Sequence, residues 1–411
     1  MAALATLRRE VARSPSVRIL HVIPYMHPSA GGPPVVVENF VREAIRRGHP
    51  SEIISTPLFC SDDQGVLLRR LNKLAPTAFL TPSRYFIPLY GPARRRFGKS
   101  IQAAEIVHVH TLWNPISIVV RRECGLRRRP YVLMPHGMLD PYSLKVKRWR
   151  KVLYLRAFER RNILAAQRVI YTTAEEERLA ATVGLPLPKG VVIPLGGDAP
   201  SGNAEVLASG FLDCFPRARG RRQILFLGRL HFKKGLDRIL AVLPTIVKTY
   251  PDTMLTVVGD GTLAFEVALK SSVASQGLQD HVMLTGRLGG NLKWGAYASA
   301  EMFLLPSRQE NFAITVAEAM QMGVPVIVSN RVNTWPYVKS AGAGIVLDEE
   351  EIEKGLEEGI FSLLRDCDTR RFMGQRGQEY ARVHLTWAGA TDCLLKCYDD
   401  VLACERSGNL S

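Results

Sequence analysis

The chain has 411 residues, of which 46% are hydrophobic and 22% charged, so it can bury substantial cores and is not a disordered chain. This length corresponds to two or three domains at about 150 residues each. Seven cysteines without a CxxC pair indicate neither a disulfide scaffold nor a structural zinc site. No apolar run reaches about 18 residues, so no membrane-spanning helix is expected. Residues 1–16 lack the apolar segment of a secretory signal, which favours a cytoplasmic location.

The charge is unevenly distributed along the chain. Residues 1–200 contain 31 lysines and arginines against 14 aspartates and glutamates, whereas residues 201–411 contain 23 against 24. The net charge of +16 therefore comes from the first half, where it is densest at 94–96, at 121–129 and at 145–161. Such a field suits a nucleic acid, an anionic membrane surface or a phosphorylated substrate. A solvated surface without a partner is the alternative.

Short apolar runs with β-branched residues alternate with helical stretches along the first half. Strands are expected at 17–23, 51–55, 106–110, 130–134, 168–172 and 190–193, and helices at 35–47, 115–124, 147–163 and 174–183. Residues 57–100 show no clear periodicity, and we assign them only as an insertion of loops and helices.

A stretch rich in glycine and proline, 194–222, interrupts this alternation, which then resumes. Strands are expected at 223–227, 253–258, 281–284, 301–305 and 325–328, and helices at 234–249, 262–275, 289–299, 312–322 and over most of 349–404. Strands that alternate with helices of this length form parallel sheets. The sequence thus predicts an α/β fold of two doubly wound, Rossmann-like domains facing a cleft, which is the default place for a binding site.

Two segments of the second half carry residues suited to a nucleotide. Gly228 to Gly235 follows an expected strand and opens a helix, and it contains Arg229, which together with Lys233 or Lys234 can pair with phosphates. Glu318 lies within an apolar helix, where a carboxylate needs a partner such as vicinal ribose hydroxyls. Glu310 precedes that helix, whose free N–H groups near Asn311 can hold a diphosphate. An ordinary amphipathic helix is the alternative.

The first half contains two further candidates. His136 stands in a Pro-His-Gly turn after an expected strand, where it would face the cleft and do proton or hydrogen-bond work near neutral pH. Gly31 and Gly32 separate the first strand from the first helix, a place for anion approach or for a flexible loop. Of the pair on the strand 106–110, His108 is expected to be structural, while His110 is a weaker candidate for the cleft.

Two patterns are set aside. Asp366 and Asp368 look like a metal–sugar motif, but they lie between expected helices, where Asp368 suits a helix N-cap better. The dinucleotide fingerprint GxGxxG is absent. No metal-ligand constellation is recognised, so we expect activity without a metal or another cofactor.

Taken together, these segments resemble glycosyltransferase family 4, a large family of retaining enzymes with the GT-B fold. The resemblance rests on Gly31-Gly32, His136-Gly137, the Arg229–Lys234 loop, Gly259-Asp260-Gly261 and the EX7E motif from Glu310 to Glu318, and it covers nearly the whole chain in order. Residues 135–159 look most like bacterial transferases of surface-polysaccharide assembly. The resemblance implies an N-terminal acceptor-binding domain over 17–195, completed by a helix at 386–405, and a donor-binding domain over 196–385.

The resemblance also implies roles for individual residues. The catalytic residues would be His136, near the reacting carbon, and Glu310, on the donor sugar. The donor site would further comprise Gly32, Arg229, Lys234, Arg287, Leu288, Asn311, Phe312, Ala313 and Glu318. Arg229 and Lys234 would hold the diphosphate, Glu318 the ribose, and the loop at Arg287 and Leu288 the base. Asn311 and Ala313 stand where the family often has glycine.

The expected partners are a nucleotide-sugar donor, an acceptor that is a saccharide or is linked to polyprenyl diphosphate, and an anionic membrane surface at the inner face of the plasma membrane. The basic first half motivates the membrane expectation. Two other classes of protein stay open. A sugar-nucleotide epimerase or a phosphorylase would share the architecture, although no pyridoxal lysine is apparent. A non-enzymatic nucleic-acid binder would suit the basic charge, but its motifs and interleaved aromatic residues are missing, so no nucleic-acid partner is expected.

Overall fold

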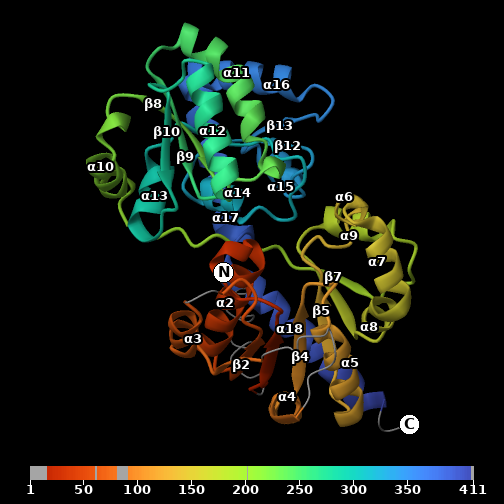
Figure 1. The fold of residues 1–411 in the computed structure, drawn as a ribbon. Coiled ribbons are helices and arrows are strands. Elements are labelled where there is room, and N and C mark those ends of the chain that lie inside the picture. The colour runs from red at the N-terminus through yellow and green to blue at the C-terminus, as the bar shows by residue number, and fades with distance from the viewer. Residues whose placement is uncertain (1–15, 61–62, 81–90, 201, 409–411) are drawn as a thin grey trace. The chain divides into compact units, whose positions relative to one another are not determined.

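A computed structural model describes residues 16–60, 63–80, 91–200 and 202–408 (Figure 1). The chain divides into two compact units. The first comprises Met1–Tyr171, Ala181–Val191 and Thr391–Ser411, and the second comprises Thr172–Ala180 and Val192–Ala390. The first unit is therefore built from the beginning and the end of the chain.

A seven-stranded sheet forms the centre of the first unit, in the order β3-β2-β1-β4-β5-β6-β7. Its strands are β1 (Ile19–Val22), β2 (Ser51–Ser55), β3 (Thr77–Phe79), β4 (Ile106–His110), β5 (Tyr131–Met134), β6 (Arg168–Tyr171) and β7 (Gly190–Val192). The described pairings from β3 to β6 are all parallel. The strand order reverses between β1 and β4, and ligands of such sheets bind beyond the carboxyl ends of the strands at this switch point.

Helices connect these strands, and the first of them begins at Gly32. They are α2 (Gly32–Arg46), α3 (Gln64–Asn72), α4 (Gly91–Ala103), α5 (Ile116–Arg127), α6 (Pro141–Lys145), α7 (Arg148–Tyr154), a π-helical turn (Leu155–Glu159), α8 (Arg160–Leu164) and α9 (Ala174–Ala181). The final helix, α18 (Trp387–Gly408), returns to the first unit from Thr391 onward.

The second unit contains a six-stranded parallel sheet in the order β10-β9-β8-β11-β12-β13. Its strands are β8 (Arg222–Leu227), β9 (Thr253–Val258), β10 (Val282–Gly286), β11 (Met302–Leu305), β12 (Val326–Ser329) and β13 (Gly344–Leu347). Its helices are α10 (Ala204–Cys214), α11 (Leu236–Thr249), α12 (Leu263–Ser275), α13 (Gly290–Ala298), α14 (Ile314–Gln321), α15 (Trp335–Ala341), α16 (Ile352–Arg365) and α17 (Cys367–His384). Here the switch point lies between β8 and β11.

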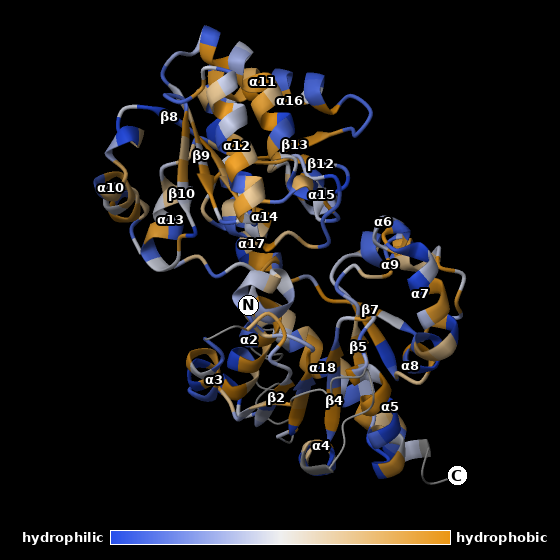
Figure 2. Ribbon diagram, viewed as in Figure 1, coloured by the Kyte–Doolittle hydropathy of each residue, from blue (hydrophilic) through white to orange (hydrophobic). Residues whose placement is uncertain are grey.

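The central strands are apolar because helices cover both faces of a parallel sheet. All four residues of β1, β5, β11 and β12 are buried, and Figure 2 shows the strands of each sheet as mostly hydrophobic. In the first unit, Val37 and Val41 of α2 pack with Ile23 and Ile53 in one fully buried cluster. The two sheets and their connecting helices confirm the predicted doubly wound α/β class.

Several local expectations are wrong. The interval 194–222 is not only a break, because it contains α10, whose N-cap is Asn203. Residues 57–100 hold α3, β3 and α4, although 81–90 lie outside the described residues. The N-cap of α17 is Asp366, whose side chain accepts from the backbone N–H groups of Asp368 and Thr369, so Asp368 does not have that role. Among the described residues, no helix is long and apolar enough to cross a membrane.

Candidate active site

In the second unit, Arg229 and Lys234 follow the central strand β8, as expected. Gly228 directly follows the strand. A single 3-10 turn, Phe232–Lys234, comes next and is capped by Gly235, whose backbone is left-handed with φ of 74°. Gly235 must be glycine, because a Cβ there would meet the Pro306 carbonyl at 2.1 Å. Arg229 is exposed, and among the described residues no ion pair or hydrogen bond of its side chain is found. This cation is therefore available to an anionic ligand.

Lys234 and Glu310 form an ion pair at the switch point of this sheet. Lys234 follows β8, and Glu310 follows β11, the strand beside it. Desolvation lowers the pKa of Lys234 from 10.5 to about 7, with further lowering by Arg229 and Lys233, whereas the contact with Glu310 favours the ammonium form. The structure thus brings together two of the predicted site residues that are 76 positions apart.

The segment Asn311, Phe312 and Ala313 leads into α14, which begins two residues later than expected. Ala313 is the N-cap and has a left-handed backbone, with φ of 54° and ψ of 71°. This conformation explains why a glycine is natural at this position. Asn311 donates to Thr172 Oγ1 at 3.0 Å, while its Oδ1 and the hydroxyl of Thr315 are buried without a hydrogen-bond partner in the described structure. Unpaired polar atoms of this kind suit a polyhydroxylated ligand.

Glu318 has two protein partners that sequence reasoning missed. Lys293 Nζ lies 2.7 Å from its Oε1, and the Tyr297 hydroxyl donates to its Oε2 at 3.0 Å. Both partners come from α13, about 20 to 25 residues earlier, and the only sequence signal was their i, i+4 spacing. Glu318 is only 8% exposed, yet each carboxylate oxygen keeps acceptor capacity for a ligand hydroxyl.

The loop of Arg287 and Leu288 lies at the end of β10. Arg287 forms a two-pronged ion pair with Asp260, at 2.9 and 3.0 Å, and both side chains are 47% exposed. Asp260 belongs to the Gly-Asp-Gly turn after β9, and a Cβ at Gly259 would meet the Gly228 carbonyl at 1.9 Å. The ion pair therefore connects this loop to the turn that packs against Gly228. Leu288 is half-buried.

In the first unit, Gly32 is the first residue of α2, whereas the sequence placed the helix start at residue 35. Gly31 is its N-cap, with φ of 97° and no side-chain cap. A Cβ at either glycine would meet nothing within 4 Å, so the N-terminus of this 15-residue helix is sterically open. Such an end attracts anions.

His136 follows β5 with a left-handed backbone, at φ of 53°. Its Nε2 lies 3.1 Å from His110 Nδ1, so the weaker candidate His110 adjoins the stronger one. Desolvation lowers the pKa of His136 from 6.5 to about 3, which makes its ring neutral near pH 7. His108 is fully buried and bonds the Tyr398 hydroxyl at 2.7 Å, in keeping with its expected structural role.

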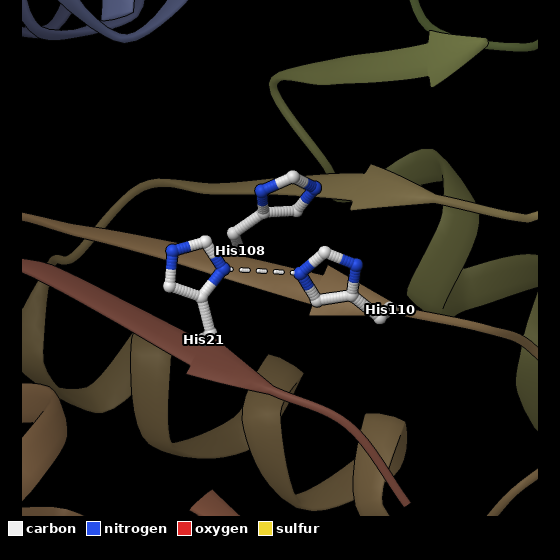
Figure 3. A group of neighbouring side chains, drawn as sticks. All are labelled: His21, His108 and His110. Carbon is white, nitrogen blue, oxygen red and sulfur yellow. Dashed lines mark hydrogen bonds between the residues drawn. The ribbon is translucent and has the colours of Figure 1, made fainter. Parts of the chain in front are cut away.

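The sequence showed no cluster of metal ligands, but the structure places His21, His108 and His110 together (Figure 3). One ring nitrogen of each lies within 4.8 Å of the others. This grouping joins strands that are more than 80 residues apart, so the sequence spacing could not reveal it.

Two family models match the chain. Residues 30–199 match "Glycosyltransferase Family 4", and residues 215–380 match "Glycosyl transferases group 1". One relative is the GDP-mannose:cellobiosyl-diphosphopolyprenol alpha-mannosyltransferase of Xanthomonas oryzae pv. oryzae, 26% identical over 86% of this chain and 90% of the relative. Another is a GDP-mannose-dependent alpha-mannosyltransferase of Mycolicibacterium smegmatis, 31% identical over 44% of each chain.

Solved structures show the same fold. Anabaena Alr3699/HepE in complex with UDP-glucose superposes with a TM-score of 0.76 at 17% identity, covering 93% of this chain and 100% of that chain. WaaG, a glycosyltransferase involved in lipopolysaccharide biosynthesis, superposes with a TM-score of 0.68 at 16% identity, covering 93% and 99%. The architecture is therefore GT-B. With family models matching both halves, the chain belongs to glycosyltransferase family 4 and is an enzyme that transfers a sugar.

Proposed function

We propose that this enzyme transfers mannose, or a closely related hexose, from a nucleoside-diphosphate sugar to a lipid-linked saccharide with retention of anomeric configuration. The observation that carries the proposal is the arrangement of Arg229, Lys234 and Glu310 at the switch point of the second sheet. It combines cations for a diphosphate with a carboxylate for a sugar. The names of the Xanthomonas and Mycolicibacterium relatives favour GDP-mannose as the donor.

The proposed donor contacts follow from chemistry. Arg229 and Lys234 bind the diphosphate, and Glu310 with Asn311 binds the sugar hydroxyls. Glu318, oriented by Tyr297 and Lys293, accepts from the ribose hydroxyls. The loop of Arg287 and Leu288 borders the base. In the first unit, Gly32 at the open start of α2 is suited to a phosphate, and His136 is suited to a hydrogen bond with a sugar hydroxyl.

The reaction breaks the bond between the anomeric carbon and the phosphate oxygen and forms a bond from that carbon to an acceptor hydroxyl oxygen on the same face. The acceptor proton passes to the departing phosphate oxygen, which gains the electron pair of the broken bond. Negative charge therefore grows on the diphosphate, where Arg229 and Lys234 stabilise it. The residues present require no metal for this step, so we propose metal-independent transfer without another cofactor.

The acceptor side is proposed to dock on an anionic membrane through an exposed segment, residues 145–158. This basic-apolar segment exposes 65% of Trp149, 59% of Leu153 and 52% of Val146. Lys145, Lys147, Arg148 and Arg150 are exposed among these apolar residues. Apolar side chains with interspersed cations are typical of surfaces that enter the interface of anionic lipid. Peripheral binding at the inner face of the plasma membrane would bring the enzyme to a polyprenyl-diphosphate acceptor.

The test is a transfer assay with radiolabelled GDP-mannose, UDP-glucose and ADP-glucose, and with cellobiosyl-diphosphopolyprenol as the acceptor. We expect labelled lipid product with GDP-mannose and an α-linkage by NMR, because the donor is an α-anomer. Activity should persist in EDTA. Transfer that is lost in EDTA and restored only by a divalent ion would contradict metal independence. Interconversion of free nucleotide sugars without an acceptor would instead identify an epimerase.

A further inference from the structure

Four histidines gather at the switch point of the first sheet. His21 of β1 is the register partner of His108 on β4, and His110 lies two residues further along β4, so the three side chains share one face. His136 follows β5, the next strand. Figure 3 shows the rings of His21 and His110 joined by a hydrogen bond, with His108 beside them. His21, His108 and His110 are buried, whereas His136, the proposed catalytic residue, is half-buried.

Three of the rings form a continuous hydrogen-bonded chain. His21 Nδ1 lies 3.1 Å from His110 Nε2, and His110 Nδ1 lies 3.1 Å from His136 Nε2. His110 thus uses both of its ring nitrogens within the chain. His108 lies outside it, because its Nδ1 bonds the Tyr398 hydroxyl and its Nε2 has no hydrogen-bond partner among the described residues.

Ring orientation argues against a shared metal ion. An imidazole nitrogen binds a metal through a lone pair in the plane of the ring. The His108 and His110 rings are stacked, with centroids 4.0 Å apart and planes 26° apart, so their lone pairs run side by side and do not converge. The nitrogens of His21 and His110 that would face an ion already face each other at hydrogen-bond distance.

Neutral rings make the chain directional. Desolvation lowers the pKa of His21 and His136 to about 3 and that of His110 well below 6.5, so each ring carries one N–H at neutral pH. If His110 donates to His136, its other nitrogen is bare and His21 must donate to it. If His136 donates to His110, His110 must donate to His21. The tautomer of each ring therefore fixes the tautomers of the others.

We propose that His110 and His21 are positioning residues that set the ring orientation and the tautomer of His136. Whether His136 Nδ1, the nitrogen outside the chain, carries a proton then depends on His21, with strand β4 lying between them. This inference rests on the proposed role of His136 in sugar transfer. Because His21 reaches His136 only through His110, the proposal predicts that a substitution of His21 changes the tautomer of His136 without touching it directly.

The direct test is the 15N spectrum of the histidine rings in the full chain labelled at histidine, in which protonated and bare ring nitrogens are well separated. His21→Leu removes the first hydrogen bond of the chain. His21→Asn is smaller than histidine but keeps a polar atom near the position of Nδ1. We expect His136 to show one tautomer in the wild type and in His21→Asn, and a mixture of tautomers in His21→Leu. An unchanged His136 pattern in His21→Leu would overturn the proposal, whether or not the enzyme transfers the offered sugar.

Kinetics provide a second readout. His21→Leu should lower kcat about tenfold with little change in the KM for the nucleotide sugar, and His21→Asn should recover most of that loss. Tyr398→Phe is the matched control, because it removes a buried hydrogen bond of His108 and leaves the chain intact. Equal loss of kcat in His21→Asn and His21→Leu would reduce His21 to a packing residue. Absence of transfer by the wild type would instead contradict the proposed function, while the ring spectrum would still decide the coupling.

Discussion

The hydroxyl of Tyr297 donates a hydrogen bond of 3.0 Å to Glu318 Oε2. Tyr297 is fully buried, and its burial together with the Glu318 carboxylate raises its pKa well above 10, so the hydroxyl keeps its proton. Lys293 holds the other carboxylate oxygen at 2.7 Å. Glu318 is thereby fixed in orientation before any ligand arrives, which lowers the entropic cost of ordering it on binding.

Removing either proposed nucleotide contact should weaken nucleotide binding. Glu318→Ala and Arg229→Ala each remove a charge-assisted hydrogen bond that costs roughly 1.5–3 kcal/mol to lose, or about 10- to 150-fold in Kd. Calorimetric titration with GDP measures this change. Arg219→Ala is the control, because Arg219 is exposed and pairs with Asp213 away from the loop after β8. Wild-type affinity for GDP in both site variants would refute the assignment.

Nucleotide binding should depend on pH through Lys234. Its pKa is lowered to about 7 in the free protein, and a bound diphosphate favours the ammonium form and raises that pKa. The complex therefore takes up a proton above pH 7, and affinity should fall by up to about tenfold per pH unit there. Lys234→Arg should bind with little pH dependence in this range, because a guanidinium does not titrate. Equal slopes for the two proteins would show that another group titrates.

His136→Asn should lower turnover far more than nucleotide affinity. Asparagine tolerates the left-handed backbone at this position better than alanine, so the loop is preserved while the ring is lost. A contact made near the reacting carbon is worth roughly 1.5–3 kcal/mol, or about 10- to 150-fold in kcat. Single-turnover kinetics with GDP titrations measure both quantities. Wild-type turnover would make His136 structural.

Membrane binding should depend on the basic-apolar segment. Neutralising Lys145, Lys147 and Arg148 together removes about 1 kcal/mol per cation near anionic lipid, and a tenfold loss of partitioning is a conservative expectation. Vesicle sedimentation at low and moderate salt measures it, because salt screens such contacts. The matched triple at 94–96 should lose less, because Arg94 already pairs with the buried Glu123 at 2.9 Å. Equal binding to neutral and anionic vesicles, or binding to neither, would show that these cations do not direct the protein to anionic lipid.

The sequence predicted the order of strands and helices well because fully buried parallel strands are short apolar runs with clear ends. The strand 253–258 matches β9 at both ends, and 51–55 matches β2. It predicted poorly where glycine and proline lie inside an element. Helix α10 was missed although Asn203 caps it, because Gly210 lies within it. Helix α4 was missed because it begins with a glycine and a proline. There tertiary packing outweighs local propensity.

For the candidate site, the sequence indicated individual residues within single loops but not their contacts with residues far away in the chain. Arg229 was indicated by the glycine that follows a strand, Glu310 by its loop after a strand, and Glu318 by being a carboxylate within an apolar helix. Their partners could not be found in the same way, because Lys234 meets Glu310 across 76 residues, and His21 meets His110 across 89. Only the strand order, with β1 beside β4 and β8 beside β11, brings such residues together.

The discontinuous first unit has a consequence for synthesis on the ribosome. Its sheet is complete once β7 emerges, but Tyr398, the partner of the buried His108, is added roughly 200 residues later, after about 10–40 s of translation. During that interval, the face of β1 and β4 that carries the histidines lacks α18. The second unit, whose main part is translated in between, is positioned to fold first. The strands of the first unit are then the last elements to reach their final packing, and fragments ending near residue 200 should be prone to aggregation.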